Sequence, residues 1–269
     1  MNRKKRKAMN RYIVKHTEKS LINKSPERIG GKASQLFNIN PDLLPHWAVI
    51  TADCPDDEIS QVSEDIYTYL YWQNPNPSGL GDKLAVRSSA VGEDGKDQSF
   101  AGIFESKLNV PITGLELAVR EVRDSAHTVK VHAYKQANYG FARPLPNSVT
   151  QNVAVIVMPM VLARYSGVLF SKEPVGGSDQ MLVEWEEGVG GVVDGESNSN
   201  MIFLDSEDFF KSGTPIDKDG HPILLYEIWQ EAKRLEKNYG RPVDIEWAIN
   251  GEGKPYVLQV RPITAGVTV

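Results

Sequence analysis

Two apolar runs near the end of the chain, joined by a turn, constrain its fold more than any other feature. The first run, PVDIEWAI (residues 242–249), alternates apolar with polar or small side chains. The second is YVLQVRPIT (256–264), and the connecting NGEGKP (250–255) has the composition of a turn. We therefore predict an antiparallel β-hairpin at the end of a sheet.

Regular strand alternation in the second run places an amide and a guanidinium together. Gln259 and Arg261 share one face, and Tyr256, Leu258 and Val260 share the other. A strand that Pro262 is about to end thus carries polar groups on a single side, which is unusual for a purely structural strand.

The register of the hairpin is limited by its apolar faces. A slip of one residue would turn one strand's core side chains to solvent, so the numbers of paired residues must sum to an odd value. A sum of 505 sets Glu246 beside Gln259 and Asp244 beside Arg261. A sum of 503 keeps the same four residues on one face.

This predicted face combines two carboxylates, an amide oxygen and a guanidinium. Carboxylate and amide oxygens are ligands that Mg²⁺ takes in small number, with phosphates and waters completing its octahedron. The forked donors of Arg261 suit a phosphate. The alternative is a surface ion pair between Asp244 and Arg261 with Glu246 solvated. The hairpin alone leaves both interpretations open.

Two stretches in the first half of the chain add candidate phosphate ligands. Lys32 follows two glycines at the predicted start of a helix, where free backbone amides and the helix dipole favour anions. Arg87 ends the apolar run of AVRSSA and is followed by Ser88 and Ser89. A solvated lysine and a structural arginine ion pair are the alternatives.

The remaining pattern predicts an α+β chain in two halves, residues 12–150 and 151–269, around a cleft. The near-continuous apolar run VAVIVMPMV is typical of a strand covered on both faces. In the helix ending at Tyr239, Gly240 is placed as a C-terminal cap. The predicted strands are 46–51, 83–90, 153–161, 166–171 and 180–185, and the predicted helices are 30–39, 56–73, 115–139 and 222–240.

Charge and composition exclude several function classes. Residues 1–11 hold six basic residues and form a predicted flexible tail, and the remaining chain carries 24 basic and 35 acidic residues. A body with a net charge of −11 argues against nucleic acid as the main partner. No apolar run is long enough to span a membrane, and Cys54 is the single cysteine, so we expect a cytoplasmic protein without a zinc site.

Taken together, these segments resemble the nucleotide-binding domain of the pyruvate phosphate dikinase, phosphoenolpyruvate synthase and rifampicin phosphotransferase family, an ATP-grasp fold. The resemblance covers roughly residues 28 to 264. The matching segments, in family order, are GGKASQL, AVRSSAVGEDGKDQSFAGIFESKLNV, VIVMPMVLARYSGVLFS, and DIEWAI followed by VLQVRPIT.

The resemblance implies a role for each candidate residue. Lys32 and Arg87 look like the family's phosphate contacts, with Ser88 beside them. Arg261 looks like the arginine that meets the transferring phosphoryl group. The hairpin's Glu246 and Gln259 look like magnesium ligands, with Asp244 on the same face. Glu184, in MLVEW, is similar in position to a carboxylate facing the nucleotide.

The sequence departs from the family pattern at three points. Met158 stands where the family has glutamine in the adenine-side strand, and Gly191 replaces a carboxylate. No histidine lies in the Thr-Ser-His context of a phosphocarrier, so the resemblance implies a nucleotide-binding unit without the phosphohistidine and barrel domains. The five histidines are expected to be ordinary surface or packing residues: His16, His46, His127, His132 and His221.

The leading hypothesis is a phosphotransferase that uses ATP and Mg²⁺ to phosphorylate a small-molecule acceptor. One alternative is the nucleotide-binding component of a split dikinase, which would release AMP and phosphorylate a histidine on a separate protein. The other is a regulatory module that binds nucleotide without catalysis.

Overall fold

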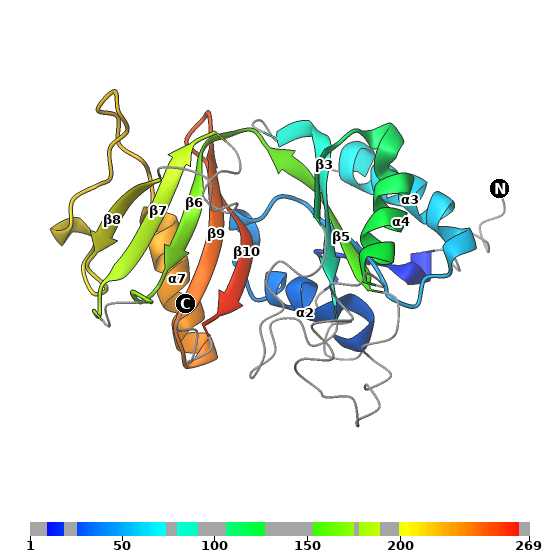
Figure 1. Ribbon diagram of the computed structural model, residues 1–269, viewed down its shortest axis with the longest axis horizontal. Coiled ribbons are helices and arrows are strands. Elements are labelled where there is room, and N and C mark those ends of the chain that lie inside the picture. Colours follow the sequence, from blue (N-terminus) through cyan, green and yellow to red (C-terminus); the bar gives the residue numbers. More distant parts are fainter. Residues whose placement is uncertain are drawn as a thin grey trace. The chain divides into compact units, whose positions relative to one another are not determined.

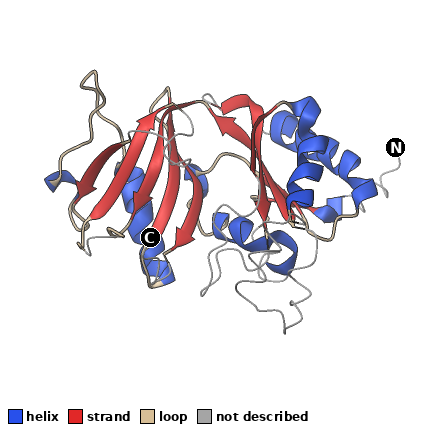
Figure 2. Ribbon diagram, viewed as in Figure 1, coloured by secondary structure: helices blue, strands red, loops and turns tan. Residues whose placement is uncertain are grey.

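The computed structural model describes residues 10–18, 26–73, 80–90, 106–126, 153–174, 178–188 and 199–263. Its strands build two sheets of five strands each, flanked by helices (Figures 1 and 2). Every strand pairing whose register is defined is antiparallel. The predicted α+β class, with mainly antiparallel sheets and flanking helices, is confirmed.

Contacts divide the chain into two compact units. Unit 1 comprises Met1–Phe37, His46–Pro77 and Gly81–Met160, and unit 2 comprises Asn38–Pro45, Ser78–Leu80 and Val161–Val269. This division is not a single cut after residue 150, because Asn38–Pro45 and Ser78–Leu80 belong to unit 2 and the last segment of unit 2 begins at Val161. The strand over Ala154–Val161 belongs to the first sheet, because it lies between two strands of that sheet.

The first sheet has the order β1-β2-β5-β3-β4. Its strands are β1 (Ile13–Lys15), β2 (Ala48–Ile50), β3 (Leu80–Ser89), β4 (Ser106–Val110) and β5 (Ala154–Val161). The helices of this half are η1 (Asn10–Tyr12), α2 (Pro26–Leu36), η4 (Asp56–Glu58), α3 (Ile59–Tyr67), η5 (Thr68–Gln73), η6 (Ile112–Gly114) and α4 (Leu115–Ser125).

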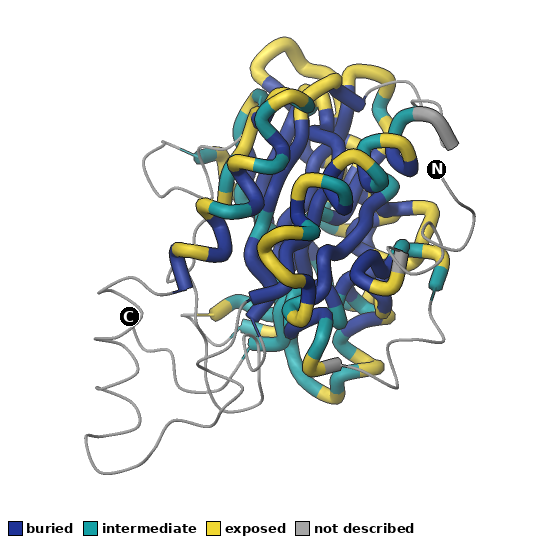
Figure 3. The backbone as a smooth tube through the Cα atoms, turned by 90° about the vertical axis from the view of Figure 1, so that its right-hand side faces the viewer, coloured by how far each residue is buried: buried dark blue, intermediate teal, exposed yellow. Residues whose placement is uncertain are grey.

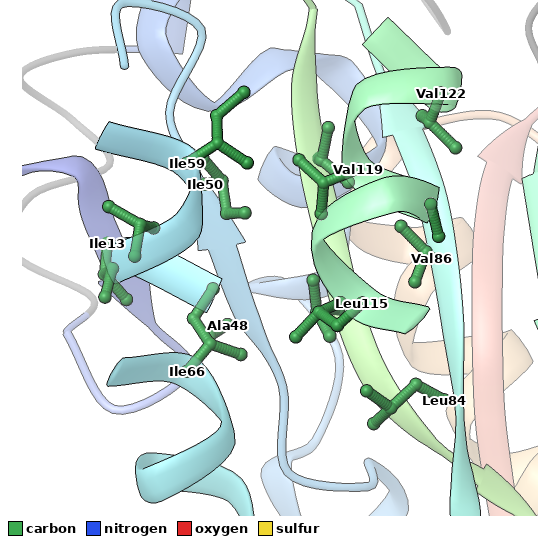
Figure 4. Packing of buried hydrophobic residues seen from close by; sticks show 14 of the residues in the cluster. Ile13, Ala48, Ile50, Ile59, Ile66, Leu84, Val86, Leu115, Val119 and Val122 are labelled. Carbon is green, nitrogen blue, oxygen red and sulfur yellow. The ribbon is translucent and has the colours of Figure 1, made fainter. Parts of the chain in front are cut away.

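Helices α3 and α4 cover one face of this sheet (Figure 4). The predicted stripe of α4 is buried: Leu115, Val119 and Val122 are at most 2% exposed. Burying each such side chain contributes about 1.5–3 kcal/mol. All eight residues of β5 are buried, so its prediction as a strand covered on both faces is confirmed. Figure 3 shows the buried backbone in dark blue and the exposed backbone in yellow. The predicted continuation of α4 to Tyr139 lies outside the described residues.

Arg123 fixes α4 to the segment that follows β2. Its side chain is buried and donates hydrogen bonds to the carbonyl oxygens of Cys54 (2.7 Å) and Thr51 (2.8 Å). It also lies 3.4 Å from a carboxylate oxygen of Asp56. The sequence pattern gave no sign of this contact, because it joins residues about seventy positions apart.

The second sheet has the order β10-β9-β6-β7-β8. Its strands are β6 (Ala163–Phe170), β7 (Met181–Glu187), β8 (Asn200–Leu204), β9 (Val243–Asn250) and β10 (Pro255–Pro262). The helices of this half are η3 (Pro41–Leu43), η8 (Phe209–Lys211) and α7 (Tyr226–Tyr239).

Helix α7 packs against β6, β9 and β10. It ends as predicted at Gly240, which adopts the left-handed conformation (φ 65°, ψ 22°) and donates its N–H to the carbonyl of Glu236. Because α7 covers one face of the sheet, polar side chains on β9 and β10 are confined to the other. In the described part of the chain, no helix has the length and apolar character that a bilayer crossing requires.

Candidate functional site

The predicted hairpin is formed by β9 and β10, and its register brings four candidate residues together. Gln259 is the cross-strand partner of Glu246, and Arg261 is the partner of Asp244. The residue numbers of each pair sum to 505, which is one of the two registers that the sequence left open. Side chains of directly paired residues lie on the same face, so two carboxylates, an amide and a guanidinium form one cluster.

The register is not uniform, because a β-bulge lies between Val257 and Gln259. Nearer the turn, Tyr256 pairs with Ala248 and Val257 pairs with Trp247. The residue numbers of these cross-strand pairs sum to an even value, so the prediction that every pair has an odd sum is wrong. The bulge inserts Leu258 as an extra residue and thereby changes the face on which later side chains lie.

Tyr256 is therefore not on the predicted face with Val260. Its partner Ala248 lies on the same face of β9 as Glu246, and Tyr256 packs there with Leu80 and Val161. The odd-sum argument assumed that one face of the hairpin is open to solvent. Near the turn both faces of this sheet are buried, so the assumption does not hold there.

Arg261 contacts both carboxylates of the cluster. Its Nε lies 3.2 Å from Oδ1 of Asp244, and its Nη2 lies 3.4 Å from Oε1 of Glu246. The side chain of Glu246 is 7% exposed, so the alternative of a solvated Glu246 is wrong. The Asp244–Arg261 ion pair of that alternative does exist. The pKa of Asp244 is raised above its ordinary value. Burial is the largest cause and the charge of Glu246 adds to it, while Arg261 acts in the opposite direction.

Glu184 lies on the same face of the second sheet. Val168 of β6 pairs with Glu184 on one side and with Glu246 on the other. At about 4.8 Å per strand, the two glutamates are about 10 Å apart along the row. This row of cross-strand partners begins at Gln259 of β10, passes through Glu246, Val168 and Glu184, and ends at the exposed Met201 of β8.

In unit 1 the glycine turn before Lys32 packs directly against the end of β3 and is hydrogen-bonded to it. Gly30 interrupts α2 with a backbone conformation of φ 75° and ψ 177°. A Cβ at this position would lie 2.0 Å from the carbonyl oxygen of Ser89. The GGK and RSSA motifs, which were identified separately in the sequence, are therefore in direct contact. A residue with a side chain at position 30 would not permit this close approach, so glycine is required there.

Ser89 makes the contact that sequence reasoning missed. Its hydroxyl donates to the carbonyl of Ile29 (2.7 Å) and accepts from the amide of Ala33 (3.0 Å). The amide of Gly31 donates to the carbonyl of Ala90. The expectation of free amides at this helix start is therefore wrong for Gly31 and Ala33, since both are already hydrogen-bonded.

Lys32 and Arg87 are both half-buried and come from these two adjoining segments. Alternation along β3 places Arg87 on the face of Ser89. Ser88 lies on the opposite face, which carries Val86 against α3 and α4. The Ser88 hydroxyl is buried and has no hydrogen-bond partner among the described residues.

The other positions noted in the sequence are placed as follows. Met158 is buried within β5. His16 stacks on His46, with ring centroids 4.8 Å apart, and its Nδ1 lies 2.7 Å from the hydroxyl of Tyr69. Burial lowers the pKa of His16, and so does His46. The following positions lie outside the described residues: Gly191, His127, His132 and the loop after Ala90 as far as residue 105.

A second polar cluster surrounds Asp217, which the sequence did not indicate. This buried carboxylate accepts hydrogen bonds from the Tyr165 hydroxyl and from the backbone amides of Asp219 and His221. It also pairs with Arg164 at 3.2 Å. The Tyr165 hydrogen bond outweighs burial and, with these contacts, holds the pKa of Asp217 well below its usual range. The cluster anchors the loop between η8 and α7 to β6.

Comparison with known proteins identifies relatives of this chain. Residues 47–215 and 224–267 match the family described as pyruvate phosphate dikinase, AMP/ATP-binding domain. A probable phosphoenolpyruvate synthase of Archaeoglobus fulgidus is 32% identical over 210 residues, which are 67% of this chain and 27% of that protein. Phosphoenolpyruvate synthase of Escherichia coli is 28% identical over 266 residues, which are 82% of this chain and 31% of that protein.

The chain spans about a quarter to a third of the length of these curated relatives. Among solved structures, a dinucleotide-forming acetyl-coenzyme A synthetase 1 of Ca. Korarchaeum cryptofilum covers 97% of this chain and 96% of its own, with 13% identity and a TM-score of 0.39.

Proposed function

Because the chain belongs to the pyruvate phosphate dikinase AMP/ATP-binding domain family, an ATP-grasp fold, we propose that it uses ATP and Mg²⁺ to phosphorylate a small-molecule acceptor. The family supports ATP-dependent phosphotransfer in general. The observation that carries the finer proposal is the hairpin cluster, in which Glu246 and Gln259 are cross-strand partners and Arg261 touches the same carboxylate.

The donor set of this cluster fits a magnesium ion. A carboxylate and an amide oxygen on neighbouring strands are hard ligands, few in number, as Mg²⁺ prefers when phosphates and waters supply the rest. Glu246 and Gln259 would hold the ion. When bound, it would neutralise charge on the nucleotide phosphates.

The chain's own residues would position the phosphates and stabilise the charge that spreads over them. Arg261 would donate its forked N–H groups to the transferring phosphoryl group. In unit 1, Lys32, which follows the glycine turn, and Arg87, near the end of β3, would each contact phosphate oxygens. Asp244 and Glu184 would complete the nucleotide-facing surface of unit 2. Such a reaction needs positioned cations more than covalent chemistry.

The test is a transfer assay with the full chain, ATP, Mg²⁺ and a panel of small-molecule acceptors, with nucleotides separated by chromatography. We expect ADP to form only with an acceptor. Arg261→Ala should reduce this rate at least a hundredfold, because it removes charge stabilisation of the transition state. The matched control is Arg241→Ala, which removes an arginine of unit 2 outside the hairpin, and it should retain the wild-type rate.

The two alternatives give different products in this assay. AMP that appears only after a protein bearing a phosphorylatable histidine is added would replace the kinase proposal with dikinase chemistry. ATP binding by calorimetry without turnover on any acceptor or partner would favour the regulatory module.

A further inference from the structure

Arg261 uses two different nitrogens to contact two different carboxylates of the hairpin. Nε faces Asp244 at 3.2 Å, and Nη2 faces Glu246 at 3.4 Å. All three side chains are at least three-quarters buried, with exposed fractions of 24%, 19% and 7%. Water therefore screens these contacts little.

In the proposed function, Glu246 has two cationic partners. The guanidinium holds its carboxylate in the present structure, and the divalent ion would hold the same carboxylate when nucleotide binds. Two cations on one poorly solvated carboxylate repel each other strongly. The phosphates of a nucleotide would relieve this repulsion, because they carry negative charge to both cations.

Asp244 makes a different contact with the same arginine. Because it binds Nε, it can hold the guanidinium on this face while Nη2 leaves Glu246 and turns to another acceptor. Asp244 is thus suited to orient Arg261 in both arrangements, with the terminal nitrogens directed to Glu246 in one and to phosphate in the other.

We propose that the Arg261 guanidinium competes with the divalent ion for Glu246 until nucleotide phosphates take up the guanidinium, and that Asp244 is the positioning residue for this exchange. The inference rests on the proposed function, since it assumes the metal and nucleotide of that proposal. Its consequence is that the metal binds weakly alone and tightly with nucleotide, with Arg261 as the cause of the difference.

The experiment measures Mn²⁺ binding to the full chain by electron paramagnetic resonance, with and without a non-hydrolysable ATP analogue. Without nucleotide, Arg261→Met should bind Mn²⁺ at least tenfold more tightly than the wild type. Arg241→Met removes the same charge elsewhere in unit 2 and should change this affinity less than threefold. Adding Glu246→Gln to Arg261→Met should abolish the gain.

The role of Asp244 has its own readout, the ¹⁵N resonance of the Arg261 Nε–H group. This signal should remain shifted and protected from exchange with and without the analogue, and Asp244→Asn should abolish both properties. A signal that is unchanged in Asp244→Asn would refute the positioning role.

The outcomes separate this inference from the proposed function. If the wild type binds Mn²⁺ with the analogue but Arg261→Met gains no affinity without it, competition is refuted and the proposed function survives. If Mn²⁺ does not bind even with the analogue, both fall.

Discussion

The substitution Gly30→Ala tests whether the glycine turn of unit 1 depends on direct contact with β3. The backbone of Gly30, at φ 75° and ψ 177°, lies in a region that essentially only glycine occupies, and an alanine there is strained by about 1–3 kcal/mol. The added Cβ would also lie 2.0 Å from the carbonyl oxygen of Ser89. No van der Waals contact is this short, so the turn and the strand end must separate.

Separation breaks at least two of the three hydrogen bonds that join these segments. The amides of Gly31 and Ala33 would lose their acceptors on Ala90 and Ser89, at about 1 kcal/mol each. Together with the backbone strain, we expect Gly30→Ala to lower the free energy of unfolding by about 3–5 kcal/mol. ATP affinity should fall as well, because the proposal assigns a phosphate contact to Lys32.

The matched control is Gly240→Ala at the end of α7. Gly240 also has a positive φ, 65°, but a Cβ there would meet no atom within 4 Å. Only the left-handed backbone cost of about 1–2 kcal/mol remains. Urea unfolding gives the free energies, and amide exchange of β2 and β5 localises the effect to unit 1. A Gly30→Ala loss no larger than that of Gly240→Ala would refute the reasoning.

Three further predictions concern stability. Arg123→Met should lower the free energy of unfolding, measured by thermal denaturation, by about 2–4 kcal/mol, because two buried carbonyls lose their hydrogen-bond donor. The control Arg120→Met, on the surface of α4, should lower it by at most about 0.5 kcal/mol, and equal losses would contradict this prediction. The lowered pKa of His16 means that the unfolded chain binds its proton more readily, so urea stability should fall from pH 7 to pH 5, and fall less in His16→Gln. The pKa of Asp217 lies well below its ordinary value of 3.8, so the stability that its carboxylate provides begins to decline only below about pH 4 and is lost as the pH falls through the folded-state pKa. Asp217→Asn should therefore lower the melting temperature at pH 7 and still lower it, somewhat less, at pH 3, as measured by calorimetry; a variant as stable as the wild type at pH 7 would contradict it.

The sequence by itself determined the elements whose pattern is local. The hairpin of β9 and β10 follows from alternation and turn composition, β5 from a continuous apolar run, and the end of α7 at Gly240 from helical spacing and a glycine. It also determined that Asp244, Glu246, Gln259 and Arg261 share one face, whereas the pairing of Glu246 with Gln259 was one of two registers that it left open. These features depend on residues close in the chain, where periodicity carries the information.

Edge strands were harder to predict. β1, β4 and β8 are edge strands of three to five residues whose sequences show little apolar alternation, and none of them was predicted, whereas the edge strand β10 was predicted from its longer pattern and the turn before it. The assignment of β5 to the first sheet depends on its hydrogen-bonded neighbours, which no local pattern reveals.

Only the tertiary structure decided the details that give the candidate site its chemistry. The bulge at Leu258 is compatible with burial because both faces near the turn are covered, and alternation in the sequence does not reveal this. Ser89 caps an amide 56 positions away, at Ala33, and so fastens the turn that precedes Lys32. The two carboxylate contacts of Arg261 likewise arise from burial of a cluster, because the partner of a buried polar group is chosen by what packing brings near it and not by its neighbours in sequence.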